Sequence, residues 1–136
     1  MTLARIRTDS LSKPLDWFLS GLDDYPKGRS AWTPLVDVIE NEEAYEVIAE
    51  IPGMNKEDIH LAVEDNVLTI SGEKTSHSAE NATCHRHERS SGKFERSFRL
   101  PKEVNAKDIK AAYTSGVLTV TLPKAAEAKP KQISIQ

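Results

Sequence analysis

Apolar and polar side chains alternate along most of the middle of the chain, a pattern typical of half-buried β-strands. Six segments show it, and each predicts one inward row of apolar residues. The rows are Tyr45, Val47, Ala49 and Ile51; Ile59, Leu61 and Val63; Leu68 and Ile70; Phe94, Phe98 and Leu100; Ile109, Ala111 and Tyr113; and Leu118, Val120 and Leu122. Together they indicate a sheet protein with one buried core.

Turn signals separate these segments at Pro52-Gly53, Asp65-Asn66 and Ser115-Gly116, and MNKEDI predicts one short helical turn. About seven short strands between such turns are expected of a two-layer antiparallel β-sandwich. We therefore predict an all-β domain over residues 34–123, with no internal repeat.

The stretch 73–92, EKTSHSAENATCHRHERSSG, interrupts the alternation and is long for a hairpin loop. Its middle, TCHRHE, could be extended. A long excursion that bears a short strand would be suited to reaching another subunit, where it could add to a sheet edge.

Both ends of the chain differ from the predicted sandwich. Residues 1–33 carry an apolar cluster with loosely helical spacing, which fits either a docked amphipathic helix or a mobile, adhesive arm. The cluster consists of Leu15, Trp17, Phe18, Leu19 and Leu22, with Leu11 before it. Residues 124–136 begin as a polar, extended connector and end with Ile133 and Ile135 on either side of one serine.

The composition mainly excludes certain partners and locations. A net charge of -3, with scattered basic residues, gives no field that would favour nucleic acid or an acidic membrane. We expect no signal peptide and no membrane-spanning helix, because no apolar run has the required length. A single cysteine, Cys84, excludes an intrachain disulfide framework, and the cytoplasm is the expected location.

Catalytic motifs are not apparent. The sequence has no G-x-S-x-G elbow and no H-E-x-x-H pair, and the Gly92-Lys93 pair lacks the glycine that a phosphate-binding loop needs at position 87. Cys84, His85 and His87 lie close together, but zinc sites usually draw four ligands in two separated pairs. We expect no enzyme activity, no metal and no cofactor; a small metal-dependent enzyme using these three residues is the last-ranked alternative.

Arg96 shares its predicted face with Phe94, Phe98 and Leu100. A guanidinium on an apolar face needs a partner, because an unpaired buried charge is very costly. We expect a structural ion pair with a Glu or Asp, either within the chain or across a dimer interface.

Several motifs, in order and at sensible spacing, resemble the small heat shock protein (alpha-crystallin) family in its bacterial form. They are WTPLVDVIE at 32–40, IPGM at 51–54, KEDI at 56–59, LTISGE at 68–73, ERSSGKFERSFRLP at 88–101, AAYTSGVLTVTLPK at 111–124 and ISI at 133–135. The resemblance covers the chain from about Trp32 to its end, and the first 31 residues match no motif, as the resemblance implies for the family's variable arm.

This resemblance implies an immunoglobulin-like sandwich and an ATP-independent holdase chaperone, which binds partly unfolded proteins and prevents their aggregation. It implies homodimers, formed when a strand from the long loop crosses to the partner's sheet, and larger homo-oligomers built from them. The dimer interface is then expected to include Cys84, His85, Arg86, His87, Glu88 and Arg96.

The resemblance also gives the terminal isoleucines a role. Ile133 and Ile135 project to one side of an extended segment, and the family docks this motif between edge strands, usually on a neighbouring dimer. The expected groove is lined by Ile59, Leu61, Val63, Ile109, Ala111 and Tyr113. Docking of the tail on its own domain stays open. Client binding is assigned to the apolar cluster of the arm and to the vacated groove.

A monomeric co-chaperone or adaptor on a related sandwich is the other alternative. Such a protein should have neither a long dimerising loop nor an I-x-I tail, whereas this sequence contains both features.

Overall fold

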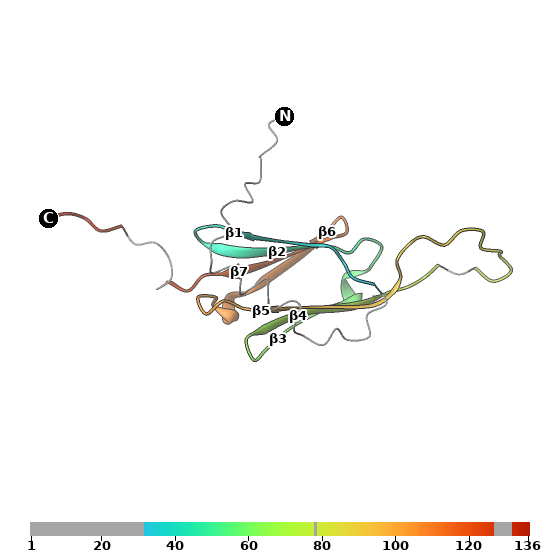
Figure 1. Cartoon of the computed structure of the whole chain (residues 1–136), viewed down its shortest axis with the longest axis horizontal. Helices are drawn as coiled ribbons and strands as arrows, with labels where there is room; N and C mark the ends of the chain where they lie inside the picture. Colours follow the sequence, from blue (N-terminus) through green and yellow to red (C-terminus); the bar gives the residue numbers. More distant parts are fainter. Residues whose placement is uncertain (1–31, 78, 127–131) are drawn as a thin grey trace, which may run out of the picture.

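The structure is a computed structural model of the 136-residue chain and describes residues 32–77, 79–126 and 132–136. Seven strands and two short 3-10 helices make up its regular part (Figure 1). In chain order these are β1 (Val36–Glu40), β2 (Ala44–Glu50), η2 (Lys56–Asp58), β3 (Ile59–Glu64), β4 (Val67–Lys74), β5 (Gly92–Arg99), η3 (Ala106–Asp108), β6 (Lys110–Thr114) and β7 (Val117–Pro123).

The strands form two antiparallel sheets packed face to face (Figure 1). One sheet has the order β1-β2-β7-β6 and the other has the order β3-β4-β5. The all-β antiparallel sandwich predicted from alternation is therefore confirmed, and η2 is the short helical turn expected in MNKEDI.

The core lies between the sheets and consists of the predicted inward rows. Its fully enclosed members include Val47, Ile51, Phe98, Val120 and Leu122, each with essentially no exposed surface. Strand register explains why these rows meet, because antiparallel partners lie on the same face of a sheet. Val47, for example, pairs with Val120, and Leu68 pairs with Phe98.

Tight turns fix this register at two hairpins. Asp65 and Asn66 join β3 to β4 with φ of 49° and 63°, and Ser115 and Gly116 join β6 to β7 with φ of 53° and 78°. Consecutive positive φ angles match the right-handed twist of the flanking strands, and Asn and Gly tolerate them best. Gly116 is further constrained, because a Cβ there would lie 2.9 Å from Pro52.

Two elements differ from expectation. The seventh strand is β1, which the alternation did not identify, because its outward position Ile39 is apolar as well as its inward positions Val36 and Val38. In the loop between β4 and β5, the described residues contain no strand, so the short strand considered for TCHRHE is not formed by the single chain.

Candidate functional site

Each sheet ends in two edge strands, and the sandwich therefore has two flanks on which edge strands of the two sheets face each other. Contacts across the sheets show which edges face each other. The Tyr113 hydroxyl of β6 lies 2.9 Å from the carbonyl oxygen of Ile51 and 3.1 Å from that of Met54, close to the start of β3. On the other flank, the segment leading into β1 contacts β5 through Trp32 and Pro34. The two flanks are thus β3/β6 and β1/β5.

The β1/β5 flank is covered by the chain itself. Pro34 is fully buried, and the ring of Trp32 packs against that of Phe94 with 5.1 Å between centroids. The inward residues of β1, Val36 and Val38, are partly buried against the core. Segment 32–34 therefore fills the space between the two sheets on this side.

The β3/β6 flank is open. Leu61 pairs with Ile70 and Val63 pairs with Leu68, so each pair shares the inward face. Ile70 and Leu68 are only 1% exposed, whereas Leu61 is 38% and Val63 41% exposed. These inward-pointing apolar side chains meet water and form an exposed apolar strip where the sequence predicted the groove, and such a surface is a candidate binding site.

The opposite wall of this groove comes from β6. Ala111 pairs with the fully buried Val120, so it faces inward, but it is itself exposed. Ile109 and Tyr113, on either side of it, are partly buried against the core, as is Ile59 on β3. All six residues predicted to line the groove therefore lie on its two edge strands or at their starts.

The terminal isoleucines do not occupy this groove in the single chain. Ile133 is 89% exposed and Ile135 is 99% exposed. Figure 1 shows residues 132–136 beyond one end of the sandwich, whereas the loop between β4 and β5 projects from the other end. Self-docking of the tail is thus not seen in this structure.

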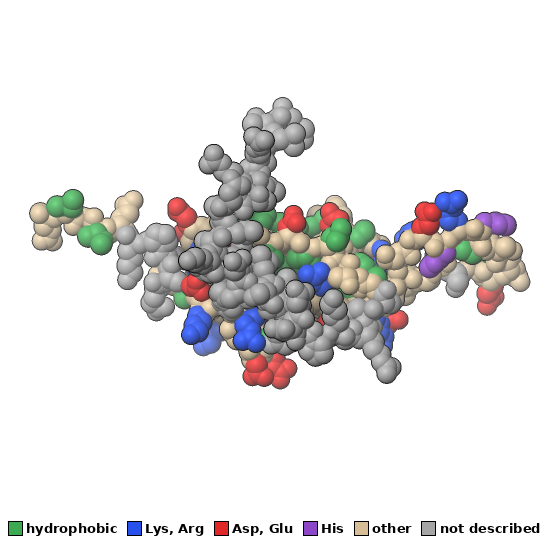
Figure 2. Space-filling view, in the orientation of Figure 1, with side chains coloured by type: hydrophobic (Ala, Val, Ile, Leu, Met, Phe, Trp, Pro, Cys, Tyr) green, Lys and Arg blue, Asp and Glu red, His purple; other side chains and the backbone are tan. Residues whose placement is uncertain are grey.

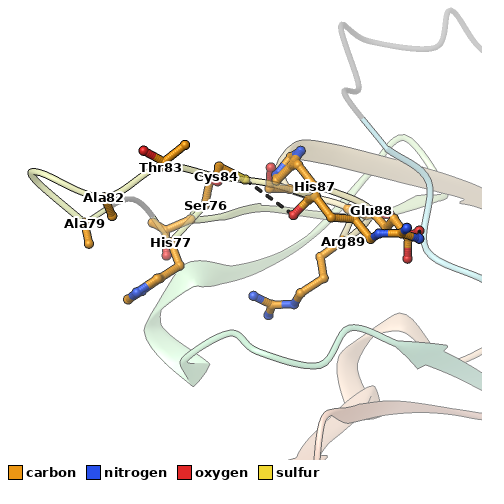
Figure 3. Close-up of a pocket in the computed structure, with 13 residues that line it drawn as sticks. Ser76, His77, Ala79, Ala82, Thr83, Cys84, His87, Glu88 and Arg89 are labelled. Atoms are coloured by element: carbon orange, nitrogen blue, oxygen red, sulfur yellow. Dashed lines mark hydrogen bonds and ion pairs between the residues drawn. The ribbon is translucent and has the colours of Figure 1, made fainter.

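The loop between β4 and β5 carries the residues predicted for a dimer interface. Cys84, His85, Arg86, His87 and Glu88 are all exposed, and the histidine side chains stand clear of the sandwich (Figure 2). The two arms of the loop enclose an open hollow of about 700 Å³, lined among others by His77, Cys84 and His87 (Figure 3).

Interactions within this loop are few and local. The Cys84 thiol donates to the carbonyl oxygen of Arg86 at 3.3 Å, and Arg86 forms an exposed ion pair with Glu88 at 2.8 Å. An exposed pair of this kind contributes little to stability. Among the described residues, no three His, Cys, Asp or Glu side chains are grouped as metal ligands.

Arg96 lies on the inward face of β5, opposite Ile70, as alternation predicted. Its guanidinium donates to the carbonyl oxygen of Pro34 at 3.2 Å and lies 5.5 Å from the centre of the Phe98 ring. Burial lowers the pKa of this guanidinium from its ordinary value. Within the described part of the chain no carboxylate lies at ion-pair distance, so the expected Glu or Asp partner is not found there.

The predicted client-binding residues, Leu15, Trp17, Phe18, Leu19 and Leu22, lie outside the described residues. Sequence reasoning did not identify Trp32 and Pro34 as the residues that close the β1/β5 flank, because both hydrogen bonds that hold them use main-chain carbonyls as acceptors. Their only signal was the quoted motif WTPLVDVIE.

Comparison with known proteins gives consistent matches. Residues 37–136 match the model of the Hsp20/alpha crystallin family. A 17.4 kDa class I heat shock protein of Arabidopsis thaliana is 46% identical over 127 residues, which cover 90% of this chain and 81% of the relative. An 18.1 kDa class I heat shock protein of Oryza sativa is 45% identical over 119 residues, covering 82% of this chain and 74% of the relative.

Solved structures agree with these relatives. A small heat-shock protein from Xylella fastidiosa has a TM-score of 0.68 and 34% identity, covering 79% of this chain and 99% of that one. Heat shock protein 16.0 from Schizosaccharomyces pombe has a TM-score of 0.66 and 35% identity, covering 77% and 99%. The plant class I relatives do not support the expected bacterial form.

Proposed function

This chain belongs to the Hsp20/alpha crystallin family, a family of small heat shock chaperones rather than enzymes, and we propose that it is an ATP-independent holdase assembled through its tail and its loop. The chaperone role in stress is common to the family. The division into an arm (1–33), a sandwich (34–123) and an extension (124–136), and the duties of each, are our proposal.

The groove at the β3/β6 flank is proposed to receive Ile133 and Ile135 of a neighbouring subunit. The observation that carries this proposal is the exposure of inward-facing Leu61 and Val63 beside fully buried partners, together with the exposure of both isoleucines. Burying two isoleucines contributes about 3–6 kcal/mol gross. Ordering the tail and losing translational freedom offset several kcal/mol of this, so a single tail is a weak link.

Many weak links make a stable assembly. In a closed particle each tail works at a high effective concentration, so the whole is far stronger than one contact. Individual subunits can still leave, because each contact is readily broken. A covered groove also protects two sheet edges that would otherwise pair with other chains.

The loop between β4 and β5 is proposed to form the dimer by reaching the sheet of a partner. Its exposed residues have no strand pairing within the described chain, and β1 offers a free edge on the flank opposite the groove. Strand addition would supply the missing pairing. Arg96 uses one of its five donors on Pro34, and we propose that a partner carboxylate takes another.

Cys84 gives this dimer proposal an independent check. It is a free, exposed thiol in the loop. If a two-fold axis brings two copies together, mild oxidation should give a covalent dimer on a non-reducing gel, and Cys84→Ser should not. Oxidised protein that runs only as monomer would contradict this arrangement.

Clients are proposed to bind the apolar cluster of the arm and the groove once a tail has left it. Apolar contact is non-directional and suits a binder of many unfolded chains. Deleting residues 1–30 should diminish protection of a model client against heat-induced aggregation. Undiminished protection would place client binding in the sandwich.

The proposal also covers the location of the protein and its cofactors. Among the described residues no helix is long and apolar enough to cross a membrane. We propose a cytoplasmic protein that works without cofactor, metal or nucleic acid, with itself and unfolded proteins as partners.

The decisive experiment is native mass spectrometry with and without residues 131–136. The full chain should give a large oligomer, and the truncated chain should give dimers or small species. A particle whose subunit number is unchanged by truncation would rule out the tail as the link. A full-length protein of about one subunit would instead revive the monomeric adaptor.

A further inference from the structure

The loop between β4 and β5 is held at its root by a residue from a distant part of the chain. Lys74 and Gly92 form the last pair of the β4-β5 ladder, so they close the loop of residues 75–91. Trp32 contacts both of them. Its indole Nε1 donates to the carbonyl oxygen of Gly92 at 2.9 Å, and the ammonium of Lys74 lies 5.2 Å from the centre of its ring.

Further contacts hold Trp32 in this position. Its ring packs against that of Phe94, and two residues later Pro34 is buried and accepts a hydrogen bond from Arg96. Trp32 therefore contacts Gly92 and Phe94, and Pro34 contacts Arg96. Segment 32–34 runs beside the inward face of β5 and ends at the root of the loop.

Lys74 is unusual among the charged residues described, because it is only 9% exposed. A buried lysine stem with its charge over an indole ring is a favourable arrangement, since the ring face is electron-rich. The end of the Lys74 side chain and the guanidinium of Arg89 both lie beside Gly53, which has a φ of 79°. The second arm of the loop thus also returns to this cluster, through Arg89, which is one of the residues that line the hollow (Figure 3).

We propose that Trp32 is the positioning residue of the dimerisation loop. It sets the direction in which residues 75–91 leave the sandwich, and it ties that direction to the point where residues 1–31 join. This inference rests on the proposed role of the loop in dimerisation. A loop held at its root loses less conformational freedom on reaching a partner, and preorganisation of this kind favours association.

The arrangement has a consequence for the arm. The residue that contacts both stems of the loop directly follows residues 1–31 in sequence. The arm therefore joins the sandwich next to the root of the loop, and we expect client capture by the arm and dimer strength to be linked. Such linkage is reciprocal, because it is a free energy shared between two sites.

The test uses Trp32→Phe and Trp32→Ala in the full chain, with Leu35→Ala as the matched control. Leu35 lies three residues away and is 76% exposed, so its loss should change nothing. The first readout is hydrogen exchange of the peptides at the root of the loop, where Lys74 and Gly92 end the β4-β5 ladder. Trp32→Phe keeps an aromatic ring but loses the donor and part of the ring contact, and exchange should be at least about fivefold faster, as expected for one lost hydrogen bond. Trp32→Ala should accelerate it at least tenfold.

The second readout is the dimer dissociation constant by sedimentation, measured in full-length chains carrying Ile133→Ala and Ile135→Ala. It should rise severalfold for Trp32→Phe and more for Trp32→Ala, while thermal unfolding of Trp32→Phe stays close to that of the parent. Lys74→Met, which removes the charge but keeps a long apolar stem, should give an intermediate loosening of the loop.

Two outcomes separate this inference from the function on which it rests. If shortening the loop abolishes the dimer but neither Trp32 variant alters loop exchange or dissociation, Trp32 does not position the loop. If shortening the loop leaves the dimer intact, the proposed dimerisation mode fails, while faster loop exchange in the Trp32 variants would still support the positioning role.

Discussion

Arg96 and Pro34 are joined across 62 positions of sequence by a hydrogen bond of 3.2 Å from the guanidinium to a carbonyl oxygen. This bond attaches β5 of one sheet to the segment that leads into β1 of the other. The β1/β5 flank is therefore closed by the chain's own backbone, while the β3/β6 flank keeps apolar residues in contact with water.

Replacing Arg96 with methionine should lower the free energy of unfolding by about 1–2 kcal/mol, because one charge-assisted hydrogen bond is lost while the apolar stem is kept. Urea unfolding of the purified protein measures this. Arg99→Met is the matched control, since Arg99 is exposed on the same strand. Equal stability of the two variants would mean that the bond to Pro34 contributes nothing.

Replacing both Ile133 and Ile135 with alanine should shrink the particle, because most of the apolar surface of the tail is removed. Light scattering at constant protein concentration gives the size. Ser134→Ala is the control, because the serine projects to the opposite side of an extended segment. A similar decrease in size for Ser134→Ala would indicate that the backbone, rather than the isoleucines, makes the contact.

Introducing a charge into the groove should also shrink the particle, because it blocks the surface proposed to receive the tail. Leu61→Glu or Val63→Glu would place a carboxylate where an isoleucine is to be buried, and burying an unpaired charge is prohibitive. The fold should tolerate both changes, since these side chains already contact water. His60→Glu, on the exposed outward face of β3, should leave the oligomer intact, as judged by size-exclusion chromatography.

The alternation of apolar residues predicted most of the core because the side-chain period of a strand directly records which face is buried. Tyr45, Leu68 and Leu118 are buried as the pattern required. The same period predicted the inward direction of Leu61 and Ala111, although it could not show that they stay exposed. Exposure at an edge depends on what covers that edge, and this is a property of the assembled sheets.

The closure of the β1/β5 flank could not be derived from sequence for a related reason. Trp32 and Arg96 both donate to carbonyl oxygens, and every residue has a carbonyl, so the acceptors leave no trace in composition. The expectation of a carboxylate for Arg96 came from charge alone. The loop strand was a further uncertain case, since TCHRHE becomes a strand only if another strand pairs with it.

Tyr45 should make stability depend on alkaline pH. Its ring is buried, and burial, with help from Glu40 and Glu103, raises the pKa of its hydroxyl well above the ordinary value of 10.0. The unfolded chain therefore loses this proton more readily than the folded chain. The stabilisation is fully present below pH 10.0 and is lost progressively as pH rises above it.

Tyr45→Phe gives the measurement for this effect. The variant should show a weaker fall in unfolding free energy above pH 10.0 than the parent, because phenylalanine has no proton to lose. Urea unfolding at a series of alkaline pH values compares the two. Parallel curves would mean that Tyr45 titrates alike in both states. All other ionisable groups are common to both proteins.

Segment 32–34 closes the β1/β5 flank, so the β3/β6 flank is the one proposed to receive a tail, and this sets the valence of the subunit, that is, the number of tails it can bind. If the tail of one chain docks in the groove of the next, as proposed, each chain offers one groove and one tail, and a closed assembly contains equal numbers of both. A chain without its terminal isoleucines could still join the assembly through its groove, but it would leave a neighbour's groove empty. Mixing such truncated subunits with intact ones should therefore limit assembly in proportion to their share, so that the mixing ratio sets the particle mass.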